Sequence, residues 1–238
     1  MRVFYNAIAD IQRLVSPGER CRPVDVGEDI QRVLIQPEAI RKKVRALGRR
    51  ISEDYGTQTD AVVLIGILKG AMFFLADLAR AITSPVEIEL MSISSYGFST
   101  RSSGVVRILK DLDVSITDRH VLIVEDIVDT GLTLSYLLCK LRARHPKSLR
   151  VCTLLDKPAR RSVDVSIAYS GFTVPDEFVV GYGLDFNQQY RNLPFIGVLK
   201  PECYGVDESG GERGEQVCRD KVAGRFATGE AATGGGDG

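Results

Sequence analysis

A pair of acidic side chains follows one strongly apolar segment of the chain. Residues 121–124 are all apolar, and Glu125 and Asp126 come directly after them. A short continuous apolar run is typical of a strand buried on both faces, so the two carboxylates are expected at its carboxyl end. Adjacent acids at that place need water, a metal ion or hydroxyl groups as partners. Taken alone, the pair is also explained by a solvated turn.

The residues that come next favour a phosphate site. Asp129, Thr130, Gly131, Leu132 and Thr133 lie between the apolar strand and a predicted helix. Free backbone N–H groups and the helix dipole at such a helix start attract anions. A ligand that offers hydroxyl groups as well as phosphate would explain the neighbouring acids, and a ribose phosphate offers both. We therefore expect the loop to hold a 5′-phosphate, while the acid pair accepts hydrogen bonds from ribose hydroxyls.

Apolar strands alternate with amphipathic helices on both sides of this segment. The predicted helices span residues 37–55, 71–82 and 132–144, and the predicted strands span residues 61–68, 86–91, 120–126, 149–157 and 178–186. This alternation predicts an α/β fold with an open, mainly parallel sheet flanked by helices. In such folds ligands bind at the carboxyl ends of the strands, which is where the acid pair and the phosphate loop lie.

The strand, the acid pair and the phosphate loop together resemble the phosphoribosyl-diphosphate signature of type I phosphoribosyltransferases. Within that group the chain is similar to the hypoxanthine-guanine phosphoribosyltransferases over about residues 29–202. The resemblance implies the family's fold with a small hood segment. It also implies purine salvage: Mg²⁺-dependent transfer of ribose 5-phosphate from phosphoribosyl diphosphate to hypoxanthine or guanine, giving IMP or GMP and diphosphate. Asp129 would then be the general base, acting at N7 of the purine.

Further segments carry the resemblance on the phosphoribosyl diphosphate side. Leu68-Lys69-Gly70 looks like the family's diphosphate loop, with a cis bond between Leu68 and Lys69. Ser95-Tyr96 begins a polar loop that is similar to the flap covering the family's active site, and Arg191 would touch the leaving diphosphate. Leu132 stands where some members have a basic residue. The implied phosphoribosyl diphosphate site comprises Leu68, Lys69, Gly70, Ser95, Tyr96, Glu125, Asp126, Asp129, Thr130, Gly131, Leu132, Thr133 and Arg191.

The purine side rests on the segments LLDKPARR and PDEFVVGYGLDFNQQYR. By resemblance, Lys157 donates to the exocyclic 6-oxygen of the purine, Phe178 stacks on the base and the Val179 backbone reads the edge of the base. Asp185 would complete the purine site and hold magnesium. The implied metal ligands are Glu125, Asp126 and Asp185. His120 and His145 have no evident supporting partners, and we assign neither to catalysis.

Composition limits the partners of the chain. Lys plus Arg and Asp plus Glu are each 31, so the net charge is zero, which argues against a dedicated nucleic-acid or membrane-surface binder. No apolar run approaches the roughly 18 to 20 residues of a membrane helix, and residues 1–21 lack a secretory pattern. We expect a cytoplasmic protein with small-molecule substrates, and organelle targeting is the alternative. The family's usual dimers and tetramers imply that copies of the chain associate.

The chain divides into three predicted parts. Residues 1–28 form an N-terminal extension, residues 29–202 the phosphoribosyltransferase domain and residues 203–238 a tail that holds 10 of the 23 glycines. Too little apolar area is available in that tail to offset the entropy of ordering it, so we expect it to be disordered.

Two rival functions stay open at this point. A phosphoribosyltransferase for pyrimidines or adenine would keep the phosphate loop without the arrangement of Lys157, Phe178 and Val179. A regulator on the same fold that binds nucleotides and RNA is disfavoured by the zero net charge and by the intact loop at residues 129–131.

Overall fold

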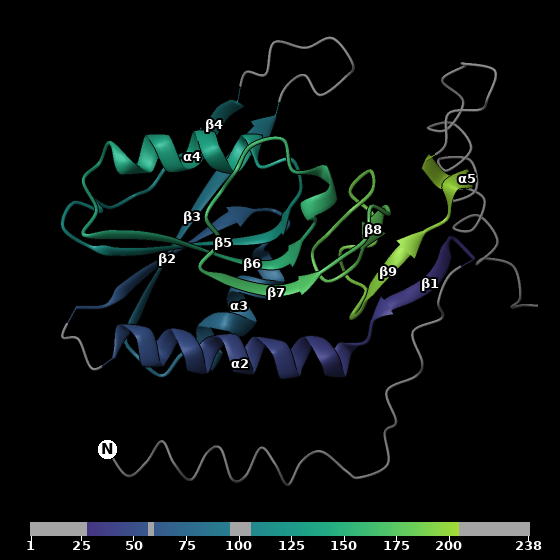
Figure 1. Ribbon diagram of the computed structural model, residues 1–238, viewed down its shortest axis with the longest axis horizontal. Helices are drawn as coiled ribbons and strands as arrows, with labels where there is room; N and C mark the ends of the chain where they lie inside the picture. The colour runs from purple at the N-terminus through teal and green to yellow at the C-terminus, as the bar shows by residue number, and fades with distance from the viewer. Residues whose placement is uncertain (1–27, 57–59, 96–105, 205–238) are drawn as a thin grey trace, which may run out of the picture.

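The structure of the protein is a computed structural model that describes residues 28–56, 60–95 and 106–204 (Figure 1). The predictions for residues 1–27, for the loop from Tyr96 to residue 104 and for residues 205–238 fall outside these ranges, so the three-part division stays a prediction. Within the described residues, no helix is long and apolar enough to cross a membrane.

A six-stranded sheet forms the centre of the fold, with the strand order β4-β3-β2-β5-β6-β7. The strands β2, β3, β5, β6 and β7 run parallel, and β4 pairs antiparallel with β3 at one edge. The bounds are β2 (Val62–Leu68), β3 (Val86–Ser95), β4 (Val106–Lys110), β5 (His120–Val128), β6 (Ser148–Asp156) and β7 (Tyr169–Thr173). The prediction of an open, mainly parallel sheet is confirmed.

Helices cover both faces of this sheet, as expected for apolar parallel strands (Figure 1). Helices α2 (Pro37–Tyr55) and α3 (Met72–Ala81) lie on one face, and α4 (Leu132–Arg142) lies on the other. Alternate strand residues point to the two layers: Leu64 and Leu122 join the core beneath α2 and α3, whereas Ile65 and Ile123 join the core beneath α4.

Helix α2 follows the sequence pattern closely. Pro37 occupies its first turn, where a missing N–H costs nothing, and four apolar residues at spacings of four, three and four are buried. These residues are Ile40, Val44, Leu47 and Ile51. The helix ends at Gly56, whose φ of 59° falls in the left-handed region that favours glycine.

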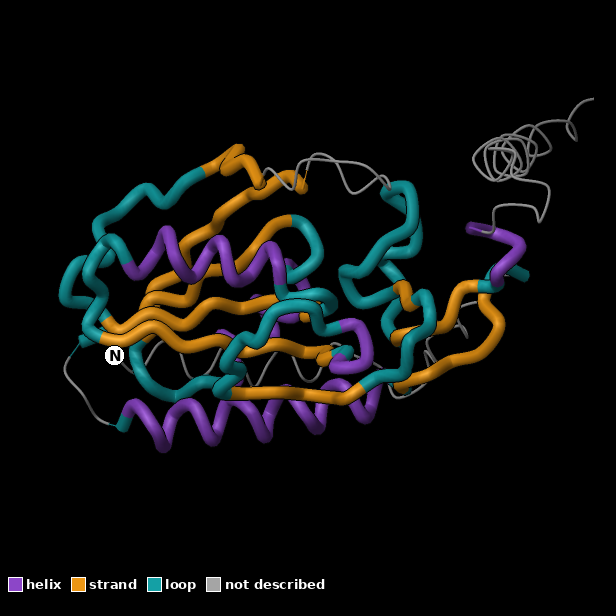
Figure 2. The backbone as a smooth tube through the Cα atoms, turned by 45° about the horizontal axis from the view of Figure 1, so that its top comes forward, coloured by secondary structure: helices purple, strands orange, loops and turns teal. Residues whose placement is uncertain are grey.

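A second, three-stranded sheet has the order β1-β9-β8 and forms a hood beyond one end of the central sheet (Figure 2). Its members are β1 (Ile30–Ile35), β8 (Val179–Val180) and β9 (Ile196–Leu199), followed by the short helix α5 (Pro201–Tyr204). All pairs in it are antiparallel. The hood therefore joins segments from the two ends of the described chain.

The predicted strand at residues 178–186 is wrong in extent and in place. Only Val179 and Val180 are extended, and they pair with β9 in the hood and not with the parallel sheet. The chain turns immediately afterwards because Gly181, Tyr182 and Gly183 have φ values of 101°, 49° and 106°. A strand cannot continue through left-handed backbone.

Candidate active site

The loop between β5 and α4 lines a pocket of about 110 Å³ that is open to solvent. Its lining includes five of the predicted phosphoribosyl diphosphate residues, namely Glu125, Asp129, Thr130, Gly131 and Thr133. Gly131 has a φ of 82°, and a Cβ atom on it would lie 2.7 Å from the carbonyl oxygen of Val163, so this position requires glycine. The tight turn leads directly into α4, and the first N–H groups of a helix lack intrahelical partners and can bind an anion. The N–H of Leu132 donates to Oγ1 of Thr130 at 3.4 Å.

The acid pair lies in the last part of β5. Glu125 is only 8% exposed, and burial raises its pKa well above the usual range, with a further contribution from the charge of Asp126. Burial also raises the pKa of Asp126 to about 6, although its Oδ1 accepts the N–H of Ile127 at 2.8 Å. Acids whose charged form is disfavoured by burial in this way are stabilised by an incoming cation or by hydroxyl donors.

The predicted metal ligands do not form a closed cage. Asp185 Oδ1 lies 2.7 Å from Nη2 of Arg191, and in the described part of the chain no three His, Cys, Asp or Glu side chains are close enough to hold a metal ion. Mg²⁺ is usually bound by one or two carboxylates together with substrate phosphates and water. The buried oxygens of Glu125 and Asp126 fit that mode of binding.

The predicted diphosphate loop lies beside the acid pair, at the carboxyl end of β2. The peptide bond between Leu68 and Lys69 is cis, as expected. Gly70 approaches the carboxylate of Asp126 closely, and Lys69 Nζ donates to Oε1 of Gln188 in the hood at 3.1 Å. The loop thus connects the acid pair with the hood.

Lys157 stands at the end of β6 and is 5% exposed. Its Nζ donates to the carbonyl oxygen of Glu177 at 2.9 Å, and it lies 3.8 Å from Oδ1 of Asp176. A buried ammonium needs hydrogen-bond acceptors, and these two contacts leave a donor for a ligand. Its backbone N–H bonds to Val128, so the lysine is also tied to the end of β5.

The predicted base-stacking residue, Phe178, already has aromatic neighbours. Its ring stacks on Tyr204 with centroids 4.8 Å apart and meets Phe186 edge-on at 5.5 Å. Val179 pairs with Val198 in the hood sheet. The structure therefore brings both residues to the hood near Lys157, and their contacts with a base stay predictions.

Arg191 braces the turn after β8. Its Nη1 donates to the carbonyl oxygen of Gly183 at 2.6 Å, and the backbone N–H of Gln188 donates to Asp185 Oδ2 at 2.8 Å. The charge of Arg191 lowers the pKa of Asp126, and that of Asp185 raises it. Both predicted hood residues therefore act electrostatically on Asp126. Of the other predicted residues, Ser95 ends β3, Tyr96 is outside the described ranges, and Leu132 begins α4.

Comparison with known proteins agrees with this arrangement. A family model described as "Phosphoribosyl transferase domain" matches residues 33–187. A hypoxanthine-guanine phosphoribosyltransferase of Mycobacterium avium is 52% identical over 202 residues, which cover 83% of this chain and 98% of that protein. The enzyme of the same name from Bacillus subtilis is 53% identical over 176 residues, covering 74% of this chain and 97% of that protein.

The chain belongs to the hypoxanthine-guanine phosphoribosyltransferase family. A crystal structure of a hypoxanthine phosphoribosyltransferase from Staphylococcus aureus superimposes with a TM-score of 0.71 at 47% identity, covering 75% of this chain and 96% of that one. The expected family and fold are thus confirmed.

Two arginines of this phosphoribosyltransferase were missed as site residues. Arg160 Nε lies 3.4 Å from Asp129 Oδ1, and Arg161 Nε donates to the backbone oxygen of Asp129 at 3.1 Å. Both belong to the segment LLDKPARR, three and four residues after the predicted purine lysine. The sequence does show two adjacent arginines shortly after a buried strand, which is a reason to consider them as site residues. It does not show which loop their side chains contact.

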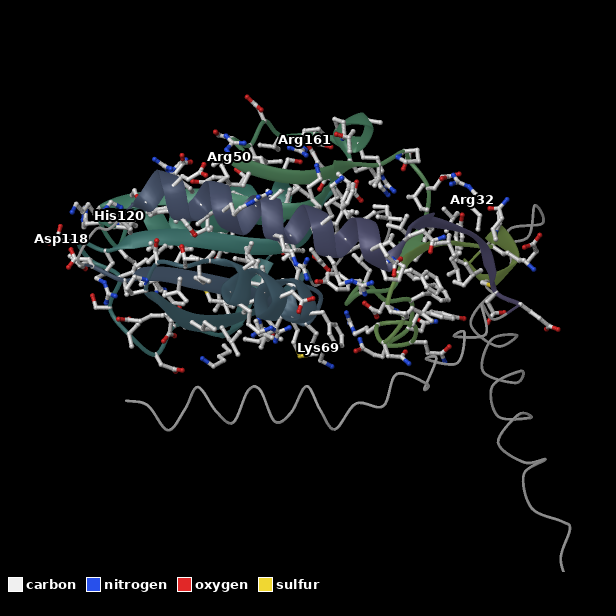
Figure 3. The ribbon with its side chains drawn as sticks, turned by 90° about the horizontal axis from the view of Figure 1, so that it is seen from below. Arg32, Arg50, Lys69, Asp118, His120 and Arg161 are labelled. Atoms are coloured by element: carbon white, nitrogen blue, oxygen red, sulfur yellow. The ribbon has the colours of Figure 1, made fainter. Side chains whose placement is uncertain are left out.

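We assign neither histidine to catalysis. His120 lies at the end of this phosphoribosyltransferase that is farthest from the hood. Figure 3 shows His120 and Asp118 at one end of the molecule and Arg32 of the hood at the other, with Lys69 and Arg161 between these ends. His120 begins β5, and its Nδ1 lies 2.7 Å from the hydroxyl of Ser148. Burial lowers its pKa.

Proposed function

We propose that this enzyme salvages purines by transferring ribose 5-phosphate from phosphoribosyl diphosphate to N9 of hypoxanthine or guanine. The products are IMP or GMP and diphosphate. The observation that carries the choice of base is the buried ammonium of Lys157, which lies between the β5–α4 loop and the hood. An ammonium donates hydrogen bonds and cannot accept them, so it suits a 6-oxygen and disfavours the 6-amino group of adenine.

The β5–α4 pocket supports binding of the 5′-phosphate of the other substrate. The threonine hydroxyls of Thr130 and Thr133 and the amides at the start of α4 would hold this phosphate. Glu125 and Asp126 would accept hydrogen bonds from the ribose hydroxyls. The diphosphate would extend toward the cis peptide loop at residues 68–70 and toward Arg191, with Ser95 and Tyr96 covering it.

The chemistry that these residues support is displacement of diphosphate by the purine. The bond to diphosphate breaks ahead of attack, and the sugar acquires positive charge that the nearby carboxylates stabilise. Asp129 would act as the general base at N7 of the purine, a role typically worth about 10²- to 10⁴-fold in rate. Magnesium, held by Glu125 and Asp126 with Asp185 nearby, would neutralise the charge of the leaving diphosphate.

One assay tests this function. The full-length protein is incubated with phosphoribosyl diphosphate, magnesium and one base at a time, namely hypoxanthine, guanine, xanthine, adenine or a pyrimidine, and the nucleotide product is measured. We expect IMP and GMP to form fastest. Faster turnover of adenine or a pyrimidine would contradict the proposal, and the xanthine reaction measures how far the 6-oxopurine preference extends.

We also propose that the enzyme is a cytoplasmic homo-oligomer, a dimer or a tetramer. Met72 and Phe73 on α3 are 47% and 37% exposed, and covering such neighbouring apolar side chains would favour association. Light scattering of the purified chain tests this, and a monomer at micromolar concentration would contradict it.

A further inference from the structure

The two arginines after Lys157 contact the same residue in different ways. Arg160 ends the short 3-10 helix η1 (Pro158–Arg160), and Arg161 follows it. The side chain of Arg160 is 50% exposed and that of Arg161 is 17% exposed. Both reach Asp129 on the β5–α4 loop.

Arg161 holds the main chain of the loop. Its Nε donates to the backbone oxygen of Asp129 at 3.1 Å, and its Nη2 donates to that of Val128 at 3.4 Å. The same guanidinium forms an ion pair with Asp156 at the end of β6. A planar guanidinium offers five donors in a fixed arrangement, so one side chain links the ends of two neighbouring strands to the loop.

The backbone beyond Arg161 reinforces this attachment. The N–H groups of Ser162 and Val163 both donate to the carbonyl oxygen of Thr130, at 2.9 and 3.1 Å. Three successive carbonyls, at the end of β5 and in the first two residues of the loop, are therefore bound by residues 161–163. The path of the loop depends on a segment that follows β6.

Arg160 acts on the carboxylate instead. Its Nε lies 3.4 Å from Asp129 Oδ1, an oxygen that is buried and accepts no hydrogen bond within the described structure. Its Nη1 lies 3.7 Å from Asp176 Oδ1, and the same oxygen lies 3.8 Å from Lys157 Nζ. Arg160 thus connects the carboxylate of Asp129 with the loop at residues 176–177, whose Glu177 carbonyl accepts the hydrogen bond from Lys157.

We propose that Arg160 and Arg161 are positioning residues that fix Asp129 from two sides, one through its carboxylate and the other through its backbone. The inference rests on the proposed function, in which Asp129 receives a proton from the purine. Proton transfer depends on the placement of that carboxylate, whereas phosphate binding depends on loop amides and threonine hydroxyls. Loss of Arg160 should therefore affect turnover more than binding of phosphoribosyl diphosphate.

The first test compares Arg160→Gln with Arg160→Lys. We expect Arg160→Gln to lower kcat about 10-fold while the KM for phosphoribosyl diphosphate changes less than about threefold. Arg160→Lys should recover most of the loss because a point charge suffices at 3.4 Å from the carboxylate. Arg45→Gln, on the exposed surface of α2, is the matched control and should behave like the wild type. An unchanged kcat in Arg160→Gln would overturn the role of Arg160.

A double variant separates positioning from a general structural effect. If Arg160 acts through Asp129, Arg160→Gln should lower kcat by no more than about twofold when it is added to Asp129→Asn. Effects that multiply would show that Arg160 acts independently of Asp129. Wild-type turnover in the same assay reports on the proposed function itself, so failure of that function is distinguishable from failure of this inference.

The role of Arg161 is tested without substrate by hydrogen exchange of residues 129–131 in the full chain. We expect faster exchange in Arg161→Gln than in the wild type because the variant loses the guanidinium bonds to the carbonyls of Val128 and Asp129. Should Arg161→Gln fail to fold, Arg161→Lys keeps a charge for Asp156 but cannot bond both carbonyls at once, and it should show the same change. Wild-type exchange in the folded variant would overturn the role of Arg161.

Discussion

Gly70 and Asp126 are in such close contact that no side chain fits between them: a Cβ atom on Gly70 would lie 1.7 Å from Asp126 Oδ2. The carboxylate is not free to turn away, because its other oxygen accepts the N–H of Ile127 at 2.8 Å. Gly70 follows β2 and Asp126 lies in β5, which are neighbours in the sheet. The diphosphate loop and the acid pair therefore form one packed unit.

Gly70→Ala should disrupt this unit. We expect kcat/KM for phosphoribosyl diphosphate to fall at least about 10-fold, with a loss of about 1–3 kcal/mol in the free energy of unfolding, as for other overpacked sites. Steady-state kinetics and denaturant unfolding measure the two effects. In an Asp126→Gly background the added methyl group should cost little stability, and an equal cost in both backgrounds would show that the clash is not with Asp126.

Asp126→Asn should make the protein more stable at neutral pH and less active. Burial raises the pKa of Asp126 from 3.8 to about 6. In the pH range between these two pKa values, the folded state therefore binds more protons than the unfolded state. Stability contributed by the protonated form is therefore lost as the pH rises through about 6. We expect the variant to raise Tm at pH 7.5 and to gain less at pH 4.5, whereas an equal gain at both pH values would contradict the assignment.

Asp129→Asn should remove proton-transfer catalysis while leaving the phosphate loop intact. We expect kcat to fall about 10² -fold or more, with a smaller change in the KM for phosphoribosyl diphosphate. Asp118→Asn is a suitable control because Asp118 is exposed at the far end of the molecule (Figure 3). An unchanged kcat in Asp129→Asn would exclude Asp129 as the general base.

Lys157→Gln should weaken the preference for 6-oxopurines. An amide is a poorer donor than an ammonium but can accept from an exocyclic amine, so we expect lower kcat/KM for hypoxanthine and guanine and slow use of adenine. Lys147→Gln, at an exposed lysine before β6, serves as the control. Intact kinetics with both 6-oxopurines would show that another group selects the base.

Local sequence determined the strands, loop and helix at the carboxyl ends of β5 and β6, where the proposed active site lies. Three patterns depend mainly on neighbours in the chain. They are the apolar run before Glu125, the loop that ends at Thr133 and the apolar face of α2. Their strand, loop and helix were predicted, with only the ends moved by a few residues. The same is true of the strand that leads to Lys157.

Tertiary structure decided the hood and the partners of the site residues. The hood pairs β1 with β9, and Ile30 lies opposite Leu199, 169 positions further along the chain. No local pattern encodes such a pairing. The sequence 178–186 is apolar enough for a strand, but the left-handed turn at residues 181–183 ends it after two residues. Likewise, the contacts of Arg160 and Arg161 with Asp129 exist only because β5 and β6 are adjacent and end at the same edge. Side-chain chemistry is therefore readable along the chain, whereas the geometry that joins distant side chains depends on how the sheet and hood assemble.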